Sequence, residues 1–399
     1  MSGGSPERST SVLAALAVAF FWAVEGIDVN APQVERVAIL LGAIGLGAAA
    51  LRGARNTAGL TVYLAVLVAV SERLRREPLE NGSDVLRATT ESLGIVASGG
   101  NPYSAVLQTT IPVGSPFVYP PGELAWYALP QWLVGDISRV DTWAGVLIVC
   151  ALGLAGLKVG FAAVALPATL YASWGVAGFR AVDGSNDVSA SALVVFACVA
   201  LAFASGGEDA RLGGVTTGGR AGRLAFVLSA VLFGWAIAFK QFSLLVLPPV
   251  VRHLATNGAD WRRYLAIALG TTAAFVLPFF VRDPGAFIGT QIALLTFHEE
   301  IWGTNLLHTL AQFGDVDMLL PLFMAAELFG TAALVWLVAT RWSAPTLGAA
   351  VLVGAGIVLV PLLLAKWTTQ PYYAYVGAIV ACGLAFLGTR TGRPRIDPE

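Results

Sequence analysis

Long apolar runs recur along the whole chain and are separated by shorter polar segments. A helix that crosses a bilayer needs about 20 mostly apolar residues, so each run predicts a membrane span. The predicted spans are residues 10–25, 34–52, 57–72, 122–135, 142–157, 160–177, 189–205, 222–239, 241–253, 263–281, 317–339, 345–365 and 372–388. The pattern therefore predicts an all-α fold, a polytopic transmembrane helical bundle of about 11–13 spans.

Two longer stretches, residues 71–121 and 282–313, interrupt this pattern with many polar side chains. Within the first, residues 83–96 place their apolar side chains on one helical face, at Val85, Leu86, Leu93 and Val96. A helix with one apolar face is suited to lying in the membrane surface. We therefore predict a surface helix in the first large extracytoplasmic segment.

Composition supports a membrane protein. Hydrophobic residues make up 56% of the chain and charged residues 12%, with a mean hydropathy of +0.73, whereas a soluble domain is about 25% charged. The net charge of −1 offers no basic field for nucleic acid, so we expect the lipid bilayer, and no nucleic acid, as a partner. The three cysteines lie in apolar runs, which predicts packing rather than disulfides or a metal cluster.

Basic residues predict the orientation, because cytoplasmic loops are enriched in lysine and arginine. Arginines at 390–395, 252–263 and 211–223 predict a cytoplasmic C-terminus in a multi-pass protein of the cell membrane. The polar stretches 73–121 and 283–316 then lie outside. Counting spans from the two ends gives conflicting parities between residues 122 and 187. Either the Pro167 segment is re-entrant or two short spans form one helix, and the sequence leaves both open.

Several motifs follow one another in a characteristic order. Asp84 opens the first outside segment, and Gly99–Tyr103 (G-x-N-P-Y) and Tyr119–Pro121 (Y-P-P) follow before the next predicted span. Later motifs are Gly184–Asp187, Phe239–Phe242 with Leu247–Pro249, and Lys366 with Tyr372–Tyr373. In this order the motifs resemble the GT-C superfamily of polytopic glycosyltransferases, and most closely its polyprenyl-phosphate-mannose-dependent, α-mannosyltransferase-like branch.

The resemblance implies a GT-C-like transmembrane bundle over residues 57–388, preceded by two transmembrane helices in 1–56 and followed by a cytoplasmic tail at 389–399. It implies inverting transfer of a hexose, mannose in that branch, from a polyprenyl-phosphate sugar donor to an extracytoplasmic glycan or lipid-linked acceptor, without a metal cofactor. The sequence departs from the pattern of the family in two ways. Asp84 is followed by Val85 rather than by a second acid, which argues against protein-mannosyltransferase or oligosaccharyltransferase activity. We also expect no soluble C-terminal domain, which leaves the choice of acceptor to the membrane loops.

Asp84 is the candidate catalytic base. Sugar transfer needs a group that removes the proton of the acceptor hydroxyl, and Asp84 stands where lipid and aqueous acceptor can both reach it. The alternative is a plain helix N-cap, a position that aspartate favours.

Other polar residues are candidates for binding substrate. Tyr103 and Tyr119 could pack against the sugar ring or belong to the aromatic belt at the membrane interface. Asn186 and Asp187 could orient a sugar hydroxyl or cap the helix that follows them.

The cations are the candidates for holding phosphate. Lys240 lies in apolar sequence, where a charge costs about 2.5–3.5 kcal/mol, so we expect it to bind the lipid phosphate with Gln241 nearby. The alternative is that it snorkels to the interface. Further substrate-binding candidates are Arg282, Asn305, Lys366 and Tyr372.

Two other classes of protein fit parts of the pattern. A multi-span transporter or lipid flippase would show related halves and paired interrupted helices, which we do not find in the sequence, and a membrane scaffold would not need this order of acid, tyrosines and lysine. The adjacent His298, Glu299 and Glu300 cannot face one ion from a helix, and their spacing is not that of metal ligands. We therefore expect no metal site.

Overall fold

The computed structural model describes residues 56–79, 83–111, 113–204, 219–296 and 301–387, together with residues 19, 40–41 and 44–48. The predicted N-terminal unit at 1–56 lies almost entirely outside the described residues, and so does the predicted tail at 389–399.

The described residues form an all-α membrane bundle, as the apolar pattern predicts. Seven helical segments are long and apolar enough to cross a bilayer. They are α3 (Thr57–Leu74), α6 (Val140–Val159), α9 (Asp187–Ala204), α10 (Gly219–Phe239), α12 (Trp261–Arg282), the composite Asp317–Thr340 and α17 (Leu347–Leu364). The composite segment consists of η2 (Asp317–Leu319), α15 (Leu320–Ala325), the π-helical η3 (Ala326–Gly330) and α16 (Thr331–Thr340).

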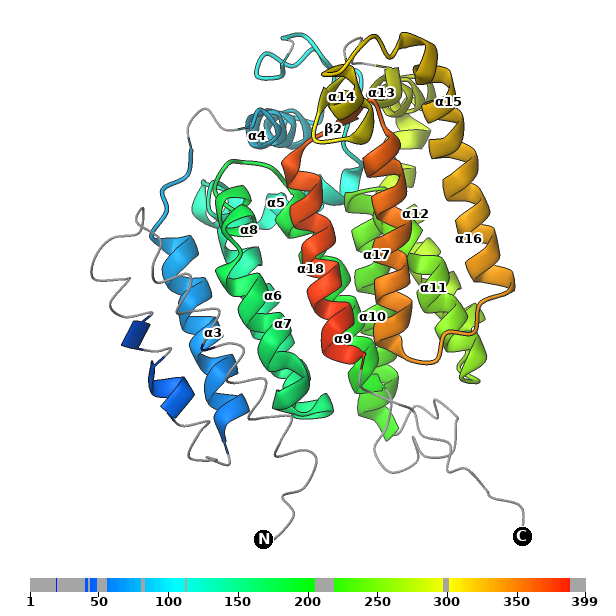
Figure 1. The fold of residues 1–399 in the computed structure, drawn as a ribbon. Coiled ribbons are helices and arrows are strands. Elements are labelled where there is room, and N and C mark those ends of the chain that lie inside the picture. The colour runs from blue at the N-terminus through cyan, green and yellow to red at the C-terminus, as the bar shows by residue number, and fades with distance from the viewer. Residues whose placement is uncertain are drawn as a thin grey trace, which may run out of the picture.

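Shorter helices also run between the two ends of the bundle: α7 (Phe161–Ser173) continued by α8 (Gly175–Arg180), α11 (Ser243–Thr256) and α18 (Gln370–Phe386) (Figure 1). By contrast, α5 (Pro121–Val134) lies at the upper end in Figure 1. Unlike α7 and α11, it is not among the apolar helices that are candidates for crossing a bilayer, and its first turn packs against α10 at this end. The span predicted at 122–135 is therefore wrong, and removing it resolves the parity conflict.

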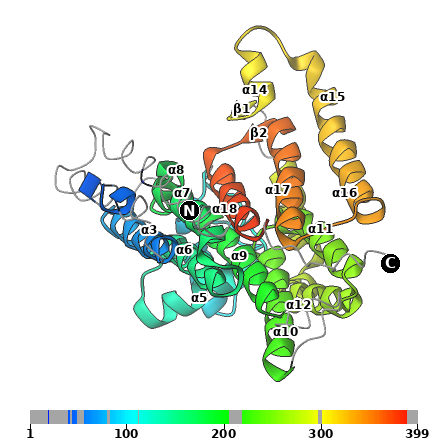
Figure 2. The same ribbon diagram turned by 60° about the horizontal axis from the view of Figure 1, so that its bottom comes forward.

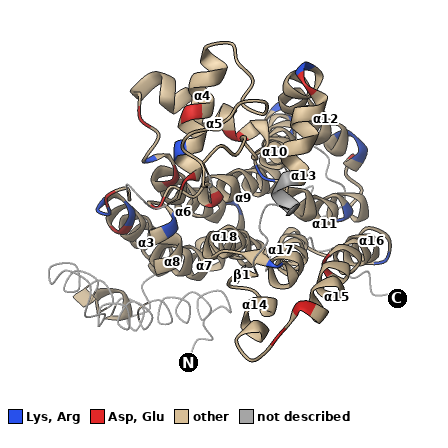
Figure 3. Ribbon diagram, turned by 90° about the horizontal axis from the view of Figure 1, so that it is seen from above, with Lys and Arg blue, Asp and Glu red and all other residues tan. Residues whose placement is uncertain are grey.

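The upper end also carries α4 (Val85–Ala97), α13 (Pro284–Thr296) and α14 (Leu306–Ala311). The predicted surface helix is α4. A short parallel pair, β1 (Trp302–Gly303) with β2 (Trp367–Thr368), ties the segment before α14 to the start of α18. Seen from above, α4 and α5 lie on one side of this end and α14 and α15 on the other, with α17 and α18 between them (Figure 3).

The centre of the bundle is α9, which packs against α6, α10 and α18 (Figure 2). Most of its residues are small or β-branched, and 83% of its apolar window is buried. Small side chains let neighbouring helices approach closely, which is how helices associate where lipid removes the hydrophobic driving force. Peripheral segments differ: only 6% of the window in Asp317–Thr340 is buried. The core therefore holds α9 rigidly, and the polar residues at its N-terminus are held with it.

The lower end of the bundle is basic. Helix termini at this end carry Lys158, Arg220, Arg223, Arg252, Arg262, Arg263 and Arg341. The described N-terminus of α3 and C-terminus of α18 lie at the same end (Figure 1). Of the arginines on which the predicted orientation rests, Arg220, Arg223, Arg252, Arg262 and Arg263 lie at this end.

Candidate active site

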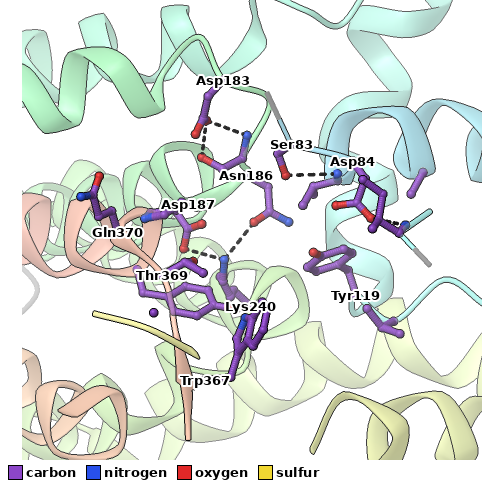
Figure 4. A pocket seen from close by; sticks show the side chains of 18 of the residues that line it. Ser83, Asp84, Tyr119, Asp183, Asn186, Asp187, Lys240, Trp367, Thr369 and Gln370 are labelled. Atoms are coloured by element: carbon purple, nitrogen blue, oxygen red, sulfur yellow. Dashed lines mark hydrogen bonds and ion pairs between the residues drawn. The ribbon is translucent and has the colours of Figure 1, made fainter. Parts of the chain in front are cut away.

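A cavity of about 830 Å³ opens at the upper end of the bundle (Figure 4). Its walls come from segments far apart in the sequence: the start of α4, the loop before α5, the α8–α9 connection, the α10–α11 turn, β1 with α14, and the start of α18. Six of the predicted site residues line it: Asp84, Tyr119, Asn186, Asp187, Lys240 and Tyr372.

Asp84 occupies the N-cap position of α4, yet its side chain makes no capping hydrogen bond. Ser83 takes that place, because its hydroxyl oxygen accepts from the backbone N–H of Val85 at 3.3 Å. The Asp84 carboxylate accepts instead from the backbone N–H of Ile111 at 2.7 Å, 27 residues away. Asp84 is therefore not simply the N-cap of α4, because its carboxylate is directed to the loop that contains Ile111 and to the cavity.

The α8–α9 connection positions this acid. The backbone N–H of Ser83 donates to the Asp183 carbonyl at 2.6 Å, and that of Leu79 donates to the Val182 carbonyl at 2.8 Å. Gly184 has φ +80°, which favours glycine, and a Cβ there would lie 3.2 Å from Leu86. The glycine thus permits the close approach that places Asp84 beside the N-terminus of α9.

Lys240 lies in the turn between α10 and α11 and is 5% exposed. Its Nζ donates to Asp187 Oδ1 at 2.5 Å and to Asn186 Oδ1 at 2.9 Å. The same nitrogen stands 4.9 Å from the centroid of the Tyr372 ring. Lys240 therefore does not snorkel: its charge is paired with a buried carboxylate at the cavity wall. An ammonium has three donors, so the described protein partners leave one N–H for a ligand.

Glu123, in the first turn of α5, is a buried partner that the sequence analysis missed. Its Oε2 accepts from Asn186 Nδ2 and its Oε1 lies 2.6 Å from Thr89 Oγ1. A Cβ at the preceding Gly122 would lie 2.5 Å from the backbone of Ala238. That glycine lets α5 press against the end of α10, and the carboxyl enters the bundle. In the sequence the residue reads as an ordinary acid near a helix N-terminus.

Burial raises the pKa of Glu123 from 4.5 to about 8, against the opposing effects of Thr89, Lys240 and Asn186. The hydrogen bonds agree with a protonated carboxyl. The Thr89 hydroxyl has one proton but two oxygen neighbours, the Val85 carbonyl at 2.8 Å and Glu123 Oε1 at 2.6 Å. If Glu123 carries a proton, it donates to Thr89, which donates to Val85, and every oxygen in the chain is satisfied.

Arg180, at the end of α8, is a second cation at the cavity that was not predicted. It donates to Asp183 Oδ2 at 2.5 Å and to Gln370 Oε1 at 2.8 Å, which joins α8 to α18. Asp183 also accepts from the hydroxyl of Ser185 at 2.6 Å. In Figure 4, Lys240 and Asp187 lie between Asp84 and Gln370. The cavity thus has an acid on one side and two cations, each paired with an aspartate, on the other.

The two predicted tyrosines have different places. Tyr119 lines the cavity, whereas Tyr103 is 1% exposed and donates its hydroxyl to the Tyr119 carbonyl at 2.8 Å. Burial raises the pKa of both phenols well above the ordinary value. The ring of Tyr103 packs edge-on against Phe117 and Phe287. Tyr103 therefore supports the loop that presents Tyr119.

The cavity lining does not include four other predicted residues: Gln241, Arg282, Asn305 and Lys366. Gln241 is exposed, and Arg282 donates to the carbonyls of Gly99 and Gly100. Asn305 caps α14 and donates to the backbone carbonyl of Lys366.

Three residues of the segment 301–311 that the predicted site did not include do line the cavity: Gly303, Thr304 and His308. His298, Glu299 and Glu300 lie outside the described residues. Among the residues that the structure describes, no three His, Cys, Asp or Glu side chains gather closely enough to hold a metal ion.

Comparisons with known proteins give similarities of fold only. No family model matches the chain, and no curated protein matches it. The solved structures that match include ArnT from Cupriavidus metallidurans bound to undecaprenyl phosphate, at 17% identity and a TM-score of 0.47 over 82% of this chain and 59% of that one. The apo state of that protein matches at 19% identity and a TM-score of 0.46, over 82% of this chain and 58% of that one.

The oligosaccharyltransferase of Archaeoglobus fulgidus, solved with a tethered acceptor peptide, also matches. It shares 15% identity and a TM-score of 0.47 over 83% of this chain and 49% of that one. This chain thus spans between 49% and 59% of the length of these three structures. Superpositions this loose carry no argument about activity.

Proposed function

We propose that this chain is a membrane glycosyltransferase that moves a hexose from a polyprenyl-phosphate donor to the hydroxyl of a glycan or lipid-linked acceptor, with Asp84 as the base. One observation carries the proposal: Asp84 and Lys240 open onto the same cavity at the upper end of the bundle. A base and a buried cation facing one another across a cavity are what transfer from a lipid phosphate requires.

The proposed step is a single displacement. Asp84 removes the proton of the acceptor hydroxyl while that oxygen forms a bond to the anomeric carbon of the donor sugar. The bond from the anomeric carbon to the phosphate oxygen breaks, its electron pair remains on the phosphate, and the configuration at the carbon inverts. The hydrogen bond from the Ile111 N–H to Asp84 holds the carboxylate in place and leaves its other oxygen for the acceptor.

The cations stabilise the charge that grows on the leaving phosphate. Lys240 has one N–H beyond those bound to Asn186 and Asp187, and Arg180 stands at the same cavity. Pairing with aspartates fixes both cations before substrate binds, so they need no reorganisation during the reaction. Tyr119 and Tyr372 offer aromatic faces at the cavity for the C–H surface of the sugar.

Mannose is the proposed sugar, from the order of motifs that the chain shares with the mannosyltransferase-like branch. The proposed location is extracytoplasmic. The lower end carries the basic helix termini, and cytoplasmic loops are enriched in such residues. The cavity at the upper end then faces the outside, where a lipid-linked donor and a cell-envelope glycan meet.

The test is sugar transfer by purified protein in proteoliposomes with radiolabelled polyprenyl-phosphate mannose and a panel of glycan acceptors. Asp84→Asn keeps an oxygen to accept from Ile111 but cannot take a proton, so transfer is expected to fall at least about a hundredfold. The matched control is Asp136→Asn, an exposed acid that accepts from Ser138 in a turn, and its activity should equal that of wild type.

Unchanged transfer by Asp84→Asn would overturn the assignment of the base. If wild type transfers no sugar from any donor in the panel but moves the labelled lipid across the bilayer, the chain is a transporter or lipid flippase instead. The two readouts come from the same vesicles, so one preparation separates these outcomes.

A further inference from the structure

Glu327 is a carboxyl group in the middle of a membrane-spanning segment, the composite Asp317–Thr340. At 1.5 Å per residue it lies about 15 Å from the level of Asp317 and about 21 Å from that of Arg341, so it is near the centre of a hydrocarbon core of roughly 30 Å. Among the described residues of the spanning helices, every other charged side chain lies close to a helix end. An acid at this depth is costly and indicates a functional site.

The backbone around Glu327 is also unusual. Residues Ala326–Gly330 form the π-helical turn η3 between α15 and α16. Single π-helical turns within α-helices are rare and occur frequently at functional sites. Glu327 is partly exposed, its neighbours Leu328 and Phe329 are exposed, and a Cβ at Gly330 would meet no atom within 4 Å. The turn therefore presents its carboxyl beside an open surface rather than within the packed core.

The neighbouring helix gives Glu327 no partner. The turn η3 packs against α17, which contains only apolar residues and glycine, so no α17 side chain can donate to a carboxyl. None of the residues that the structure describes forms a hydrogen bond or an ion pair with Glu327. The Thr331 hydroxyl, one turn further along, is buried and also lacks a hydrogen-bond partner within the described part of the chain. Two polar groups of this segment are therefore unsatisfied.

A cation for Glu327 has to come from outside the described chain. In the ranges that the structure describes, the lysines and arginines of the spanning helices lie near helix ends and none lies at the depth of Glu327. A second copy would add the same residues, and a symmetric contact at η3 would bring two carboxyl groups together. The composite segment lies at the edge of the bundle (Figures 1 and 2), and only 6% of its window is buried. A helix of another protein can therefore reach it.

We propose that η3 is the docking site for a transmembrane helix of a second membrane protein, which carries a lysine or arginine at mid-bilayer depth that pairs with Glu327. Opposite charges within a bilayer pair because lipid solvates neither of them, so charge selects this partner. The open surface at Gly330 lets the backbone of a second helix approach closely, as small residues do between membrane helices. The inference does not depend on the proposed function, because no residue of Asp317–Thr340 lines the upper cavity.

The test uses the full chain in proteoliposomes and a synthetic transmembrane peptide of leucine and alanine with one central lysine. Fluorescence energy transfer from labelled protein to labelled peptide measures association, in comparison with the same peptide carrying a central leucine. Wild type should bind the lysine peptide about tenfold more tightly, equivalent to about 1.4 kcal/mol, and Glu327→Leu should lose this preference. Asp317→Asn is the matched control, since Asp317 is an exposed acid at the end of the same segment, and it should keep the preference.

Glu327→Gln keeps the shape of the side chain without its charge and should lose most of the preference, which provides the test if Glu327→Leu does not fold. Equal binding of the two peptides by wild type would overturn the inference, and so would a preference for lysine that survives in Glu327→Leu. Energy transfer between two differently labelled copies of the wild type, abolished by Glu327→Leu, would show that a second copy occupies the site. That result would also overturn the inference.

Discussion

Glu123 offers a sharp test of how the centre of the site is built, through the variant Glu123→Gln. The carboxyl is 0% exposed, and burial raises its pKa to about 8. At neutral pH it is therefore mostly protonated and bonded to Thr89 and Asn186. Glutamine has nearly the same shape, with an amide N–H to donate to Thr89 and an oxygen to accept from Asn186. The variant should fold and retain transfer activity.

The sign of the pH dependence follows from the raised pKa. Between about pH 4.5 and 8 the folded protein keeps a proton on Glu123 that the unfolded chain has released. The stability contributed by this group is therefore complete below pH 4.5 and is lost as the pH rises through 8. Each pH unit in this window costs about 1.4 kcal/mol, so between pH 6 and 8 wild type should lose roughly 2–3 kcal/mol from this group. Glu123→Gln should lose none of it.

The assay is thermal unfolding in detergent at several pH values between about 6 and 8, comparing the slope of Tm against pH. Glu91→Gln is the matched control. Although burial opposes the effect, hydrogen bonds from Gln108 and Thr109 lower the pKa of Glu91. The stability that Glu91 contributes is therefore lost only at pH values below this range, and Glu91→Gln should keep the wild-type slope of Tm against pH. An equal slope for Glu123→Gln and wild type would refute the reasoning.

Two further predictions concern the supports of the site. Gly122→Ala should lower Tm and the yield of folded protein, because its Cβ would lie 2.5 Å from the Ala238 backbone, whereas Gly94→Ala, with nothing within 4 Å in α4, should raise stability by up to about 1 kcal/mol. Tyr103→Phe keeps the ring contacts but loses the hydrogen bond to the Tyr119 carbonyl, so thermal unfolding should show a loss of about 0.5–1.5 kcal/mol. Equal stability of the two glycine variants, or of Tyr103→Phe and wild type, would contradict these assignments.

Local sequence alone determined the class of the fold. A bilayer solvates apolar side chains and leaves helices to satisfy their own backbone, so long apolar runs predict helices whatever surrounds them. The same rule marked Lys240 as unusual, because a charged side chain in apolar sequence is costly unless it is paired. The span predicted at 122–135 was wrong because apolar composition does not show where in the bundle a helix lies. Its composition is that of a span, and only the packing of its first turn against α10 shows that it lies at the end of the bundle.

Tertiary structure alone decided how the site is assembled. Asp84 meets Ile111 across 27 residues, Asn186 meets Glu123 across 63, and Lys240 meets Asp187 across 53. The spacing of apolar residues along the chain does not predict these contacts, because they depend on which helix ends the bundle brings together. Those contacts turn a solitary lysine into one half of a buried ion pair, and burial raises the pKa of a glutamate that in the sequence resembles any acid at a helix start. Sequence could name charged residues, but their protonation and partners depend on burial and distance, which arise only when distant segments pack.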